Sequence, residues 1–298
     1  MQSLTLESAT ERNPSLLGRV LPRFHVKAFT GGMIVLFFIL TGVIGPSVAP
    51  HDPNQQQLNL MMKAPQGIGA TNVLGTDNLG RDILSRIIHG ARVSLLVAFA
   101  VVFVSGFIGV SLGAISGYFG GKIDFAIQKL VEVVWAFPPL LLGITIMAFL
   151  GQGLFNLILA LVAQRWIPYC RVVRGQALSL RERDFVVAAR CLGASQTQVI
   201  LRHIIPNLIQ TSLVIGTFAM ASSIIAEASL SFLGVGVPPE IPTWGTMLAD
   251  ARIYISTAWW MPLFPGLCIF VSVLGINLLG DAMRDLLDPR LKRTGSGV

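Results

Sequence analysis

Runs of about twenty mostly apolar residues, separated by short polar segments, recur along most of this chain. A helix needs about 20 such residues to cross the hydrocarbon core of a bilayer, which is about 30 Å thick. Five runs are clear, and a sixth is weaker because Gln164, Arg165 and Pro168 interrupt it. The predicted spans are 28–49, 93–115, 130–150, 154–170, 208–235 and 261–279. The sequence therefore predicts an all-α integral membrane protein with six transmembrane helices.

The composition supports lipid as the solvent for much of the chain. Hydrophobic residues make up 53% and charged residues only 12%, against about 25% charged in an average soluble domain. The net charge of +7 would suggest a nucleic-acid ligand in a soluble protein. Here the basic residues lie between apolar runs, so membrane topology explains them better. We expect lipid contact and no nucleic acid.

The distribution of basic residues predicts the orientation. With six spans and both ends in the cytoplasm, 1–27 and 281–298 are cytoplasmic tails, 171–207 is an inner loop and 50–92 is an outer loop. The outer segments then hold few basic residues: Lys63, Arg81, Arg86, Arg92 and Arg252. All other lysines and arginines face the cytoplasm, as the positive-inside rule requires. Arg165 is then expected at the inner end of the fourth span. No cleaved leader is expected at the N-terminus.

Small residues and prolines predict how the spans are shaped. Gly109, Gly113 and Gly117 recur every four residues and share one helix face, which allows a second helix to approach closely. Pro138 and Pro139 remove two backbone donors from the third span and should kink it. Trp244, Trp259 and Trp260 are expected as anchors at the headgroup level.

Two acidic residues, Glu132 and Glu227, fall within predicted spans. A charge at the bilayer centre costs on the order of 3 kcal/mol, so such groups face the bundle or a wet cavity. Glu132 lies one turn from Lys129 and is expected in a solvated position near the inner interface. Glu227 lies deeper. It is either a polar contact to a pathway or partner, or a buried hydrogen bond between helices.

The inner loop has the pattern of two short helices joined by a glycine. Asp184 can cap the first, through Leu192, and Gly193 suits the left-handed residue that ends it. Ser195 can cap the second, from Gln196 to about His203. Pro206 then marks the entry to the fifth span.

This loop resembles the EAA loop of ATP-binding-cassette (ABC) importer permeases. The matching residues are Ala188, Ala189, Gly193, Ile204 and Pro206, while Val187 stands where that pattern has a glutamate. The segments 74–95, 226–245 and 277–290 are similar to signatures of the dipeptide, oligopeptide and nickel permeases of the C type. The resemblance covers nearly the whole chain after about residue 28.

The resemblance implies a permease that forms, with a second homologous permease, the translocation pathway for peptides. It also implies two cytoplasmic ATPases, which bind ATP and Mg, and an extracytoplasmic substrate-binding protein. The second short helix of the inner loop would be the coupling helix that docks on an ATPase. The implied docking residues are Ala188, Ala189, Gly193, Ala194, Ser195, Arg202 and His203. An outer-loop signature of Gly75, Thr76, Asp77, Gly80, Arg81 and Asp82 would lie at the membrane surface, either solvated or meeting the receptor or partner permease.

The residues leave other classes of function with little support. An ion-coupled secondary transporter, the main alternative, would need paired ionisable groups inside the membrane and inverted repeats, and only Glu227 is a deep acid. No phosphate-binding Gly-Lys-Ser/Thr loop is present, so the chain is not expected to hydrolyse ATP. His51 and His89 lie too far apart to predict a metal site. We predict no catalytic, cofactor or metal residue.

Overall fold

The computed structural model describes residues 17–287, with side chains from residue 26, and these residues form helices and loops without a β-strand. The N- and C-terminal ends of the predicted tails lie outside the described residues. The elements are α1 (Leu17–Val48), η1 (Leu58–Leu60), α2 (Ile83–Phe119), α3 (Gly121–Trp135), α4 (Pro139–Leu150), α5 (Leu154–Leu180), α6 (Asp184–Cys191), α7 (Gln196–Val199), the π-helical turn η2 (Ile200–Ile204), α8 (Ile205–Phe232), α9 (Trp244–Ala251) and α10 (Trp260–Leu287).

Four segments of the described chain are long and apolar enough to cross a membrane. They are Val26–Val48, Ile83–Phe119, Gln196–Phe232 and Trp260–Leu286, and the bent pair α3–α4 makes a fifth if it counts as one span. The weakest of the six predicted spans, 154–170, lies in α5, and α5 is not among these four or five segments. The all-helical membrane class therefore holds, with four or five apolar spans by length and composition.

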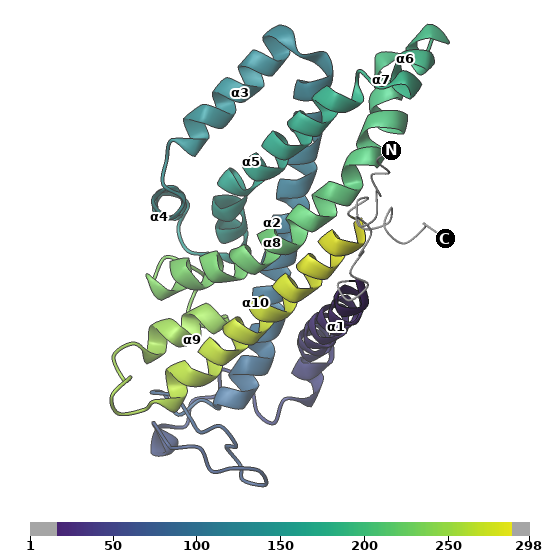
Figure 1. Ribbon diagram of the computed structural model, residues 1–298. Coiled ribbons are helices and arrows are strands. Elements are labelled where there is room, and N and C mark those ends of the chain that lie inside the picture. The colour runs from purple at the N-terminus through teal and green to yellow at the C-terminus, as the bar shows by residue number, and fades with distance from the viewer. Residues whose placement is uncertain (1–16, 288–298) are drawn as a thin grey trace, which may run out of the picture.

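The long helices lie lengthwise beside one another, α4 lies across them, and two groups of loops and short helices mark opposite ends (Figure 1). We call these the α6 end, which carries α6 and α7, and the α9 end, which carries α9 and the segment 50–82 before α2. Helix α2 has 37 residues, so at 1.5 Å per residue it is about 55 Å long. This exceeds the hydrocarbon thickness, so α2 connects the two ends of the molecule as one continuous element.

The glycine face of α2 packs directly on α5, as the four-residue spacing predicts. A Cβ built on Gly113 would lie 2.6 Å from the carbonyl oxygen of Cys170, and one on Gly117 would lie 2.5 Å from that of Arg174. Gly109 faces the backbone of Trp166 in the same way. The contact steps by four residues along both helices, so the backbones touch with no room for a side chain.

The Pro138–Pro139 pair breaks the third predicted span instead of only kinking it. Helices α3 and α4 meet at 85°, so 130–150 is not one straight helix. Pro138 has no N–H for the carbonyl oxygen of Val134, the normal helical acceptor four residues back. The Gln164 amide from α5 donates to that oxygen at 3.3 Å and to the Phe137 oxygen at 2.6 Å. A polar residue that weakens the fourth span in the sequence thus stabilises the corner of the third.

The helices continue past several of the predicted spans, because an apolar run marks only part of each helix. Residues 83–92 of the predicted outer loop belong to α2, and the first part of the predicted inner loop, to Leu180, belongs to α5. Helix α1 already begins at Leu17 and α10 continues to Leu287, inside the two predicted tails. Hydropathy marks where a helix can meet lipid, whereas its end depends on caps and packing outside the membrane.

Candidate functional site

Helix α6 is a discrete short helix at the α6 end. Its N-cap is Arg183, in extended conformation, so the predicted cap Asp184 is instead the first helical residue. The chain leaves the helix through Gly193 at φ +84°, a left-handed conformation that strains any residue with a Cβ. Ser195 then accepts a hydrogen bond from the Gln198 N–H, while the Gln198 side chain accepts one from the Ser195 N–H. This reciprocal capping box starts the next helix.

The predicted second short helix is not separate. Helix α7 passes through η2 into α8, giving one continuous helix, Gln196–Phe232. Pro206 lies in the first turn of α8 and cannot bond to the carbonyl oxygen of Arg202. The Ile205 N–H bonds instead to Ile200, five residues back, so the proline is accommodated by a π turn rather than by a break. The discrete element of this loop is therefore α6.

The α6 end is fixed to the long helices by buried contacts. Val186 of α6 and Val199 and Ile204 of the next helix are fully buried, in a cluster with residues of α2, α5 and α8. The Arg190 guanidinium lies 4.9 Å from the centre of the Tyr118 ring at the end of α2. Arg181 donates to the Gly117 carbonyl oxygen at 3.3 Å. Val186 and Arg190 thus connect α6 to α2, and Arg181 connects the end of α5 to α2.

The opposite face of α6 is apolar and exposed. Phe185 is 45% exposed and Leu192, seven residues on, is 87% exposed, with Ala188 between them. We call Phe185, Ala188 and Leu192 the α6 stripe. Of the predicted docking residues, Ala188, Gly193, Ser195 and Arg202 are exposed, and Ala189, Ala194 and His203 are half-buried.

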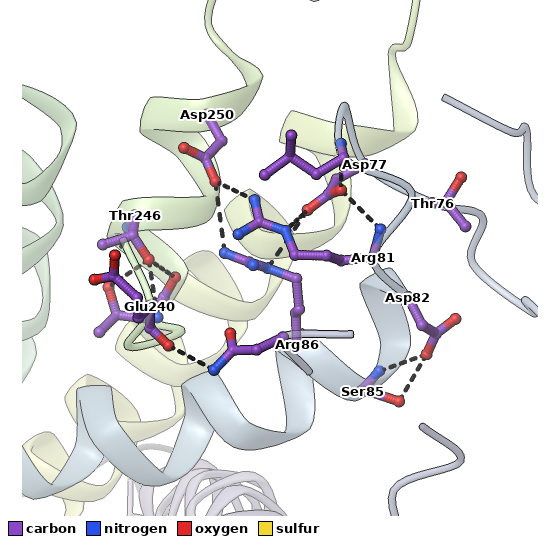
Figure 2. Close-up of polar contacts among 12 residues, drawn as sticks. Thr76, Asp77, Arg81, Asp82, Ser85, Arg86, Glu240, Thr246 and Asp250 are labelled. Carbon is purple, nitrogen blue, oxygen red and sulfur yellow. Dashed lines mark hydrogen bonds and ion pairs between the residues drawn. The ribbon is translucent and has the colours of Figure 1, made fainter. Parts of the chain in front are cut away.

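At the α9 end, four charged side chains form a buried network (Figure 2). Asp77 accepts from the Arg81 Nε at 2.6 Å and lies 3.7 Å from the Arg86 Nε. Asp250 of α9 approaches both arginines, at 2.9 Å from Arg81 and 3.5 Å from Arg86. Arg86 is 1% and Arg81 5% exposed. Two carboxylates neutralise two guanidinium groups, and the network joins α9 to the segment before α2.

The other signature residues shape this segment. Gly75 and Gly80 have φ of +79° and +71° and touch the backbone of Lys63 and Gln57, respectively. The Thr76 hydroxyl accepts from the Lys63 N–H at 2.9 Å. Asp82 caps α2, because its carboxylate accepts from the Ser85 N–H at 2.8 Å.

The expectation that this charge cluster is a solvated or receptor-facing surface is therefore wrong for the charged side chains. Asp77, Arg81 and Asp82 are each about 5% exposed or less, and their polar atoms are satisfied within the chain. Sequence reasoning also missed Asp250, which lies 169 residues from Arg81. No local pattern connects residues so far apart, although an isolated carboxylate beside an apolar helix was a weak signal.

The two intramembrane acids differ as their sequence contexts suggest. Glu132 is 56% exposed and pairs with Lys129 at 2.7 Å. Glu227 is fully buried and accepts hydrogen bonds from Ser231 at 2.9 Å and from Ser94 of α2 at 3.3 Å. Of the two interpretations of Glu227, this arrangement is the buried hydrogen bond between helices.

Two of the three tryptophans are not anchors. Trp244 is fully buried, and its indole N–H donates to the Ile87 carbonyl oxygen at 3.2 Å. Trp260 is 6% exposed and donates to the Thr76 oxygen at 3.2 Å. Trp259 is 56% exposed, so it alone presents its ring outward. Both buried rings pack the α9 end together.

Arg165 does not lie at the inner end of its helix. It is near the middle of α5, because α5 continues to Leu180, and its Nη1 donates to the Ser222 hydroxyl of α8 at 2.6 Å. The short apolar run 154–170 made the helix appear to end nearby.

The chain is similar to known membrane transport proteins. The family described as "Binding-protein-dependent transport system inner membrane component" matches residues 109–293, and the "N-terminal TM domain of oligopeptide transport permease C" matches residues 23–65. The "Di/tripeptide transport system permease protein DppC" of Pseudomonas aeruginosa is 41% identical, with 90% of each chain covered. The "Oligopeptide transport system permease protein OppC" of Bacillus subtilis is 35% identical over 96% of this chain and 94% of its own.

A solved structure shares the fold. A chain of the MetNI methionine ABC transporter superposes with a TM-score of 0.54 at 17% identity, over 67% of this chain and 96% of its own. At that identity the likeness concerns the fold alone. The curated relatives, at 35–42% identity, and the family match over residues 109–293 also establish the family. This chain belongs to the binding-protein-dependent transport system inner membrane components, and it is a multi-pass permease of an ABC transporter.

Proposed function

We propose that this permease pairs with a second homologous permease to form an import pathway for peptides, most simply di- or oligopeptides. An extracytoplasmic binding protein delivers the peptide, and two cytoplasmic ATPases, which hold ATP and Mg, drive the cycle. Relatives that are 35–42% identical are named for di/tripeptide, dipeptide or oligopeptide transport, which supports the substrate class. The observation that carries the mechanism is the discrete helix α6, exposed and apolar on one face and fixed to α2 on the other.

We further propose six spans with both termini in the cytoplasm. The α3–α4 pair serves as the third span and α5 as the fourth. Helix α5 can cross the membrane with low hydropathy because α2, α4 and α8 pack against it and shield it from lipid. The charge asymmetry of the loops supports a cytoplasmic α6 end and an external α9 end.

In this arrangement α6 receives force from an ATPase. The α6 stripe supplies an apolar contact surface, and ATP-driven approach of the two ATPases would displace it. Since Val186 and Arg190 connect α6 to the end of α2, and α2 packs closely on α5, the displacement moves α2 and α5 as one packed unit. Such a rigid-body transition exposes the pathway alternately to each side. Docking is thereby assigned to α6 and not to the segment 196–203.

The overall proposal is tested by reconstituting this chain with its partner permease, ATPases and receptor in proteoliposomes. Uptake of labelled dipeptide should require ATP on the side of the membrane where the ATPases lie. It should persist when ionophores collapse the proton and sodium gradients. Uptake that follows the ion gradient and ignores ATP would establish the ion-coupled alternative instead.

Replacing Leu192 with aspartate should weaken ATPase binding by about tenfold, because a charge would enter an apolar contact surface, a loss of about 1.4 kcal/mol. The matched control is Leu201→Asp, since Leu201 is also exposed at this end, at 58%, but lies off the α6 stripe. Titration of purified ATPase onto the permease pair in nanodiscs measures both affinities. A larger loss for Leu201→Asp than for Leu192→Asp would return the docking surface to the segment 196–203, and equal losses would contradict docking on α6 alone.

A further inference from the structure

A line of polar side chains joins α5 to α8. Arg165 donates from Nη1 to the Ser222 hydroxyl at 2.6 Å and from Nη2 to the Ser222 carbonyl oxygen at 2.9 Å. Gln176 donates to the Thr211 hydroxyl at 2.8 Å. The two contacts are eleven residues apart on each helix, running in opposite directions, so they lie on one seam of an antiparallel pair. All four side chains are half-buried rather than enclosed.

In the proposed six-span arrangement, with the start of α5 and the end of α8 at the external membrane surface, Arg165 lies near the bilayer centre. It is eleven residues from the start of α5 at Leu154, and Ser222 is ten residues from the end of α8 at Phe232. Each interval is about 15 Å, half of a hydrocarbon core about 30 Å thick. The same ends of the two helices are held together by Gln152, which donates to the Gly234 carbonyl oxygen at 2.9 Å. Both helices therefore give the same depth.

The guanidinium group of Arg165 has neutral acceptors only. Among the side chains that the structure describes, those of residues 26–286, no carboxylate pairs with it, whereas Arg81, Arg86 and Arg174 each pair with an aspartate. Its two hydrogen bonds use two of the five N–H donors of the side chain. A buried or lipid-facing charge costs several kcal/mol unless it is compensated. A half-buried cation at this depth is best explained by an anion that reaches it from a water-filled pathway.

We propose that Arg165 binds the carboxylate of the transported peptide at the midpoint of the pathway, an inference that rests on the proposed peptide-import function. A peptide with a free C-terminus carries one carboxylate, and the guanidinium fork matches its two oxygens. Ser222 holds the fork when no peptide is present and gives way when the carboxylate arrives. Because the serine competes for the same donors, the site binds weakly, and a peptide can leave it again.

The test compares three variants of the reconstituted transporter, Arg165→Gln, Arg165→Lys and Ser222→Ala, with two forms of one dipeptide, free and C-terminally amidated. Uptake is expressed per receptor loaded with each form. We expect Arg165→Gln to slow uptake of the free peptide about tenfold, in line with the loss of a charge-assisted hydrogen bond. The amidated form should change less than twofold. Arg165→Lys should keep most free-peptide uptake. Ser222→Ala, which removes the competing hydroxyl, should alter uptake of the free peptide more than uptake of the amidated form.

A second measurement varies the charge at position 165 while the peptide and the receptor stay the same. In a Cys191→Ser background, which removes the exposed cysteine, Arg165→Cys is treated with a cationic or a neutral thiol reagent of similar size. The cationic reagent should restore free-peptide uptake and the neutral one should not, and free peptide should protect the thiol from both.

Three results would overturn the assignment. Equal losses for free and amidated peptide would mean that the charge serves the helix pair and not the carboxylate. Failure of Arg165→Gln to assemble with the second permease would point to a carboxylate of that subunit as the partner. Unchanged free-peptide uptake by Arg165→Gln would show that Arg165 does not bind the peptide, without contradicting peptide import by this permease. If the wild-type complex transports no peptide, the proposed function itself fails.

Discussion

Replacing Gly113 with leucine is expected to destabilise the permease by about 3 kcal/mol or more, because overpacking in a close contact forces backbones apart. The new Cβ would lie 2.6 Å from the Cys170 carbonyl oxygen and 3.0 Å from Val173. Neither helix can move alone, since Gly109 and Gly117 fix the same contact one turn away on each side. We expect loss of folded protein in the membrane or a large drop in Tm in detergent.

Gly32→Leu is the matched control, because no atom lies within 4 Å of a Cβ built on that helical glycine. Its Tm, measured by thermal size-exclusion chromatography of the tagged protein, should stay within a few degrees of wild type. If Gly113→Leu were equally well tolerated, α2 and α5 would not pack in this register.

Asp77→Asn should cost about 3–5 kcal/mol of stability, since removing one member of a buried ion network leaves the remaining charges uncompensated. Arg81 and Arg86 would then share the single carboxylate of Asp250, which is 28% exposed. The amide nitrogen of the new asparagine would also face an arginine donor. Limited proteolysis of the segment 50–82 and a Tm measurement both report the loss.

The comparison variant is Glu132→Gln, which removes an exposed ion pair with Lys129. Exposed pairs contribute about 0–1 kcal/mol, so its Tm should barely change. Adding Arg86→Met to Asp77→Asn should recover part of the stability, because it removes an uncompensated cation. An Asp77→Asn protein as stable as Glu132→Gln would mean that the network is open to water.

The residues of the α6 end show how far local pattern extends. Gly193 ends a helix because only glycine adopts its φ without strain, and Ser195 begins the next helix through bonds three residues away. Both were predicted because cause and effect lie within one helical turn. The continuation of that next helix into α8 was not, because Pro206 normally signals a boundary and the π turn that accommodates it has no sequence signature.

The sequence by itself determined the all-helical membrane class, the glycine face of α2, a distortion at Pro138–Pro139 and the family of the chain. These depend on apolar length, helical spacing and missing backbone donors, which are properties of contiguous residues. Only the tertiary structure decided that Asp77 and Asp250 neutralise the same arginines, that Trp244 is buried, and that Arg165 of α5 bonds to Ser222 of α8. Such pairings join residues that are far apart in the sequence. Whether a charged group or an indole ring is buried depends on which distant residues pack against it.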